Sequence, residues 1–94
     1  MIKEYYLIDE NTQKLTPVKG SELHDGMFVY INEDGNYQIA EESTGLNVGF
    51  ALDNLDDINK LCDLHVNRLN EFRKTAHYEA RVAQFLQARR ALEC

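Results

Sequence analysis

The forty residues from Asn54 to Glu93 contain no glycine and no proline. Because these two residues most often interrupt helices, their absence predicts helix throughout the segment. No apolar run approaches the roughly 18 residues that cross a membrane, and the N-terminus lacks the apolar stretch of a signal peptide. Two cysteines are too few for a disulfide framework. These absences predict a cytoplasmic protein without a membrane span.

The charge is distributed unevenly along the 94 residues, which carry a net −6. Residues 1–53 carry −7 and residues 54–94 carry +1. Hydrophobic content of 44% and charged content of 28% are those of an ordinary globular protein. We therefore expect a single domain over 1–94, with a β-rich acidic half (1–53) and a helical half (54–94). An acidic surface disfavours contact with nucleic acids and anionic membranes.

The first half is patterned as short strands separated by polar turns. Alternation of apolar and polar residues is clearest over 46–52, and Asp34-Gly35 is typical of a hairpin turn. Pro17 cannot donate to a ladder, which places it at an edge. The predicted strands are Ile2 to Asp9, Leu15 to Lys19, Met27 to Ile31, Tyr37 to Ala40 and Leu46 to Leu52. The predicted fold is α+β: an antiparallel sheet of four or five short strands, followed by a long C-terminal helix or a helical hairpin packed on it.

The apolar stripe of the helical half changes face midway. Asp53 or Asn54 is the expected helix cap. The residues expected to face the sheet are Ile58, Leu61, Cys62, His65, Leu69 and Phe72, and those expected to meet them are Met27, Val29, Ile31, Val48, Phe50 and Leu52. The later apolar residues fall on the opposite face.

The length of the helical segment bears on whether it forms one continuous helix. Forty helical residues would span roughly 60 Å, whereas a compact domain of this size is roughly 30 Å across. The helix therefore either protrudes or breaks, and the best break lies at 74–77, where Thr75 can act as an N-cap. A continuous helix would carry an apolar seam suited to a second helix, which predicts self-association as a homodimer. The seam residues are Leu64, Tyr78, Val82, Phe85 and Leu86.

Motifs for catalysis, metals or nucleotides are lacking. Cys62 and His65 have a spacing that could place two ligands on one zinc, but no further ligands follow with a zinc-site spacing. The turn at 32–36 imitates an EF-hand start, yet Tyr37 and Ser43 stand where glycine and glutamate are required. Ser21 and His24 share a loop without the glycines of a nucleophile elbow. We expect no catalytic residues, no metal and no cofactor, and so a protein that is not an enzyme.

The arginines and lysines of the helical half project around the whole helix rather than along one stripe, which disfavours direct nucleic-acid binding. In size, acidity and lack of motifs the chain is similar to small inhibitors that phages carry against host systems. The leading hypothesis is a non-catalytic inhibitor or adaptor that binds a basic macromolecular partner, such as a protein with a basic surface, through its acidic β-half. The acidic residues expected to make that contact are Glu33, Asp34, Glu41 and Glu42.

A second hypothesis concerns the tyrosines, which are abundant in the predicted strands. Tyr5, Tyr6, Tyr30 and Tyr37 could form a stacking surface for a ring. On this reading the protein is a small-molecule or nucleotide binder, with a tyrosine-lined pocket between sheet and helix.

Overall fold

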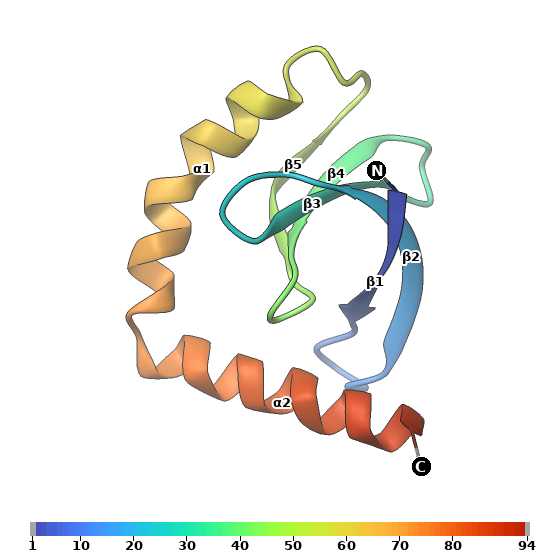
Figure 1. Cartoon of the computed structure of the whole chain (residues 1–94), viewed down its shortest axis with the longest axis vertical. Helices are drawn as coiled ribbons and strands as arrows, with labels where there is room; N and C mark the ends of the chain where they lie inside the picture. Colours follow the sequence, from blue (N-terminus) through green and yellow to red (C-terminus); the bar gives the residue numbers. More distant parts are fainter. Residues whose placement is uncertain (1, 94) are drawn as a thin grey trace.

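A computed structural model describes residues 2–93, which form a five-stranded antiparallel sheet followed by two helices (Figure 1). The strands pair in the order β1-β2-β3-β4-β5, so each strand neighbours the next one in sequence. The elements are β1 (Ile2–Ile8), β2 (Leu15–Glu22), β3 (Met27–Ile31), β4 (Tyr37–Glu41), β5 (Asn47–Leu52), α1 (Ile58–Arg73) and α2 (Ala76–Glu93). The predicted α+β fold is confirmed, and of the four or five strands expected the sheet has five.

The sheet is strongly curled, so that its first strand returns to the turn between β4 and β5 (Figure 1). The backbone N–H of Ile8 donates to the carbonyl oxygen of Gly45 at 3.1 Å. The concave side encloses a small aromatic core, in which the ring of Tyr5 stacks on Phe28 with centroids 4.0 Å apart. Strand β2 extends past the predicted end at Lys19 and includes Gly20. This position needs glycine, because a Cβ there would lie 2.7 Å from the carbonyl oxygen of Val29.

Helix α1 covers the other side of the sheet and buries the main apolar core. The cluster comprises Met27, Val29, Ile39, Ile58, Leu61, Cys62 and Leu69, with Val48, Leu52 and Phe72 packed against it. The predicted helix face and most of its predicted sheet partners therefore meet. Ile31 and Phe50 do not join them, and both are largely exposed.

Phe50 is exposed because β5 is irregular at the preceding residue. Gly49 has φ +71°, in the left-handed region that favours glycine, and the pairing of β4 with β5 shifts register between Tyr37 and Ile39. Alternation along the strand is interrupted at that point, so Phe50 leaves the face that Val48 shares with the core. The side chain of Phe50 is 73% exposed.

The start of α1 differs from the prediction. The helix begins at Ile58 after Asp57, whereas Asp53 or Asn54 was expected to cap it. The side-chain oxygen of Asn54 accepts the backbone N–H of Asp56 at 3.0 Å. This local bond stabilises a turn that competes with helix, which is why the helix starts later.

The helical segment is interrupted between Arg73 and Ala76, within the predicted break at 74–77. Thr75 is the hinge: its N–H donates to the carbonyl oxygen of Phe72, and its hydroxyl accepts the N–H of Tyr78 at 3.2 Å. The two helices form an L, with α1 along the sheet and α2 across the end of the curl (Figure 1). Neither helix, within the described residues, has the length and apolar content to cross a membrane.

The break removes the continuous seam that a single helix would have presented. Phe85 is buried in α2 and lies against Gly45, while Tyr78 and Val82 are half-buried. Leu64 and Leu86 stay exposed, but on different helices. Three of the five seam residues therefore pack within the chain, and self-association stays a prediction that rests on the other two.

Candidate functional site

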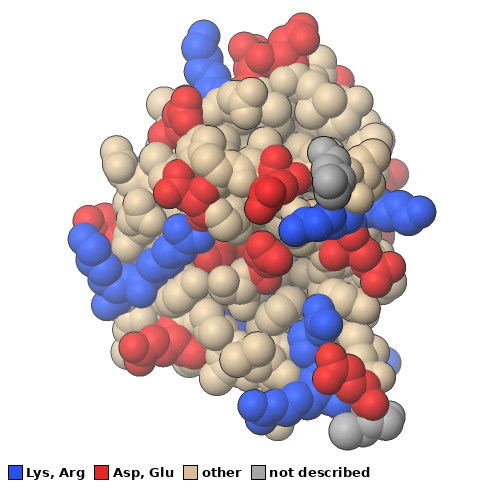
Figure 2. Space-filling model, viewed as in Figure 1, with Lys and Arg blue, Asp and Glu red and all other residues tan. Residues whose placement is uncertain are grey.

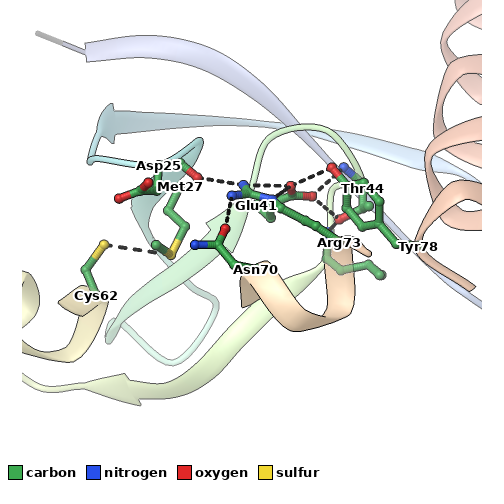
Figure 3. A network of polar contacts seen from close by, with 9 residues as sticks. Asp25, Met27, Glu41, Thr44, Cys62, Asn70, Arg73 and Tyr78 are labelled. Carbon is green, nitrogen blue, oxygen red and sulfur yellow. Dashed lines mark hydrogen bonds and ion pairs between the residues drawn. The ribbon is translucent and has the colours of Figure 1, made fainter. Parts of the chain in front are cut away.

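Glu41 is the centre of a buried polar network that ties the sheet to both helices (Figure 3). Its side chain is 1% exposed, and one carboxylate oxygen accepts the N–H and the hydroxyl of Thr44 at 3.1 and 2.8 Å. The other oxygen accepts from Arg73 Nε and Nη2 at 3.0 and 2.9 Å, and from the Tyr78 hydroxyl at 2.9 Å. Arg73 Nη2 also donates to the carbonyl oxygen of Asp25 at 2.6 Å. The network joins β4, α1, α2 and the β2–β3 turn.

This network corrects the expectation that Glu41 contacts a partner. A carboxylate that is buried and saturated by five hydrogen bonds cannot also bind a cation from outside. The neighbouring Glu42 is exposed, but it lies in the β4–β5 turn, away from the hairpin that carries Glu33 and Asp34. The four predicted acidic residues therefore do not form one surface.

A groove at the open end of the concave face contains Glu33 and Asp34. We call it the acidic groove; it has a volume of about 400 Å³ and runs between β1, β2 and the β3–β4 hairpin. Strand β2 pairs with β3 only from Gly20 to Glu22, so the earlier part of β2 splays away and opens the groove. The carboxylate of Asp9 is the third acid on its wall, and sequence reasoning missed it.

The acidic groove has no basic side chain among its lining residues. Its three carboxylates make no ion pair within the described residues, although Asp9 also accepts the N–H groups of Asn11 and Thr12 in its own turn. Apolar side chains, Leu7 and Val18 among them, form part of the floor. The arrangement suits a cation carried on an apolar stem.

Outside this groove the surface is mixed. Figure 2 shows acidic and basic side chains interleaved over the visible face, so that neither sign forms one continuous patch. The net charge of −6 therefore does not mark a broad acidic face on this side of the molecule. Recognition by charge must rest on local features such as the acidic groove.

A second groove, of about 390 Å³, lies between β5 and α1, and we call it the β5–α1 groove. Its position matches the predicted pocket between sheet and helix, but no tyrosine lines it. Phe50, Phe72 and His65 supply its rings instead. Tyr5 and Tyr30 are buried in the concave core, where burial raises the pKa of both hydroxyls. Tyrosine therefore does not line the groove between sheet and helix, although Tyr30 lines the acidic groove and, together with Tyr37, a third groove on the sheet.

Cys62 and His65 do not converge on a common point. Cys62 is fully buried with its Sγ 3.7 Å from Met27 Sδ, and burial raises the pKa of its thiol. His65 packs on Gly49, where an added Cβ would lie 2.5 Å from its Nε2. Residues 2–93 contain no group of three or more His, Cys, Asp or Glu placed to hold a metal ion. Cys94 lies outside the described residues.

A polar cluster that the sequence did not indicate surrounds His24. Its Nδ1 lies 2.5 Å from Asp25 Oδ2, and its Nε2 lies 2.6 Å from Asp63 Oδ1 on α1. The hydrogen bond with Asp25, helped by that with Asp63, raises the pKa of His24 above its ordinary value. Because Asp63 is 39 residues away, only the fold could reveal this cluster.

Comparison of the chain with known protein families, with curated proteins and with solved structures finds no match.

Proposed function

We propose that this protein is a non-catalytic interaction module, an inhibitor or adaptor of the kind that phages carry against host systems. It binds a partner with a basic surface through the acidic groove. Asp9, Glu33 and Asp34 contact the partner, whereas Glu41 holds the fold together. The observation that carries the proposal is the lining of this groove: it contains no basic residue, and its three carboxylates make no ion pair within residues 2–93.

The lining chemistry suggests how the contact is made. An arginine or lysine side chain laid in the groove would place its aliphatic stem on Leu7 and Val18 and its charged head among the carboxylates. A bidentate carboxylate–guanidinium pair adds geometric selection, which favours arginine over lysine. Acidic side chains elsewhere on the surface would speed encounter with a basic partner, and added salt would slow it.

The test uses an acetylated, amidated tetra-arginine peptide as probe and follows backbone amide shifts of the protein by NMR. We expect shifts around Asp9, Thr16 and the 32–36 turn, because these positions line the groove. Glu33→Gln/Asp34→Asn should weaken binding about fivefold or more, since two charge-assisted contacts are lost.

Glu22→Gln/Glu42→Gln is the matched control, because it removes the same charge from two exposed acids outside the groove. We expect this variant to change affinity less than about twofold. Equal losses in the two variants would show that the peptide responds to net charge alone, and the proposal would then fail.

A further inference from the structure

The β5–α1 groove has the opposite charge character to that of the whole chain. Glu10 and Glu41 both line it, but each is already paired: Glu10 with Arg81 at 3.4 Å and Glu41 with Arg73 at 2.9 Å. Arg68 also lines the groove and makes no ion pair within residues 2–93. The charge left unneutralised on this groove is therefore a guanidinium.

The rest of the lining is apolar or aromatic. Phe50 stands at the groove 73% exposed, and Leu69 and Phe72 line its α1 wall. The volume of about 390 Å³ falls in the range of small-molecule sites. An apolar groove with one free cation is complementary to an apolar body that carries one negative charge.

His65 adds a polar group to the lining of the groove, and its ring centroid lies 6.3 Å from that of Phe50. It stands one helical turn before Arg68 on α1, and its Nε2 is buried with no hydrogen-bond partner in residues 2–93. Buried polar atoms normally have a partner. The imidazole is held in place by its contact with Gly49, whose missing side chain leaves room for the ring.

We propose that the β5–α1 groove binds a small aromatic or aliphatic carboxylate, with the carboxylate on Arg68 and the apolar body between Phe50 and Phe72. This site is separate from the acidic groove, and it does not depend on the proposed function. It replaces the predicted tyrosine-lined pocket with one lined by phenylalanines and a histidine.

The experiment titrates the protein with 2-naphthoate and, separately, with its neutral amide 2-naphthamide, and follows backbone amide shifts by NMR. We expect both probes to shift amides of 46–50 and 65–72, with naphthoate binding more tightly. Arg68→Gln should weaken naphthoate about threefold to fivefold and leave naphthamide unchanged, since only the carboxylate pairs with the guanidinium.

Two exposed apolar residues provide a matched pair of variants. Phe50→Ser and Leu64→Ser each remove a side chain that is 73% exposed, so neither should disturb folding. Phe50 lines the groove and Leu64 does not. We therefore expect Phe50→Ser to weaken both probes by a similar factor and Leu64→Ser to leave both unchanged.

Four results would overturn the proposal. Shifts centred on other residues, or equal affinity for naphthoate and naphthamide, would remove the assigned site or its charge preference. Shifts of the same amides on raising protein concentration, without a probe, would show that a second copy of the chain occupies the groove. Binding of an acidic phenylalanine-containing tripeptide with no response to naphthoate would show that the groove binds a protein partner instead of a small molecule.

Discussion

The two grooves of this protein have similar volumes but opposite local charge. In the acidic groove three carboxylates lie without an ion-pair partner among the described residues. In the β5–α1 groove both lining carboxylates are paired with arginines, whereas Arg68 makes no ion pair within residues 2–93. The difference shows that pairing, rather than composition, sets the charge that a ligand meets.

Glu41 illustrates the point most clearly. It belongs to the acidic half of the sequence, yet its carboxylate is neutralised by an ion pair with Arg73 inside the fold. Glu33 and Asp34 come from the same half and keep their charges available.

The largest effect is expected from Glu41→Ala. Removing this carboxylate leaves the guanidinium of Arg73, which is 24% exposed, without its main partner, and the loss should be about 3 kcal/mol of unfolding free energy. Urea denaturation measures it. Glu42→Ala, one residue on and exposed, is the control and should stay within about 0.5 kcal/mol of wild type. A loss below about 1 kcal/mol for Glu41→Ala would mean that the network adds little stability.

A smaller effect is expected from Gly49→Ala, at the wall of the β5–α1 groove. Strain at φ +71° costs about 1 to 2 kcal/mol, and displacement of His65 should raise the total to about 2 to 3 kcal/mol. Gly35→Ala is the matched control, because its φ is +82° and a Cβ there meets nothing within 4 Å. The difference in unfolding free energy between the two variants measures the His65 contact, and equal losses would refute it.

The smallest effect is expected at His24, whose two ring nitrogens contact the exposed carboxylates of Asp25 and Asp63. Its pKa is raised in the folded protein, first by the hydrogen bond with Asp25, above the ordinary 6.5. The stabilisation is therefore complete below pH 6.5 and is lost as pH rises through the raised pKa. Melting temperatures of wild type and His24→Gln should converge between about pH 5 and pH 8 as pH increases. A constant difference over that range would contradict the assignment.

The sequence predicted the strands, the α1 face and the place of the helix break, because hydrophobic periodicity and turn residues are local signals. It did not predict that Glu41 is buried, since its partners Arg73 and Tyr78 come from distant segments. Asp9 was missed for a similar reason: it reaches the acidic groove through the curl of the sheet, which no local pattern encodes.

The exposure of Phe50 was also not predicted, because the apolar residues alternate regularly over 46–52 and give no sign of the left-handed backbone at Gly49. A glycine within a strand pattern is the one signal that could have indicated it. The predicted seam of the helical half is not continuous, because the helix breaks at Thr75 and Phe85 packs against Gly45. Local signals thus located the elements, while the residues that line the two grooves depended on how those elements meet.

The sequential strand order has a kinetic consequence. Every strand pairs with its neighbour in sequence, so the sheet can grow by closing short loops, which is fast. The apolar core between the sheet and α1, and contacts such as the Arg73–Glu41 pair across 32 residues, must wait for the helices. We expect the sheet to form ahead of the helical L, so that Glu41→Ala speeds unfolding and hardly changes the folding rate in a chevron plot.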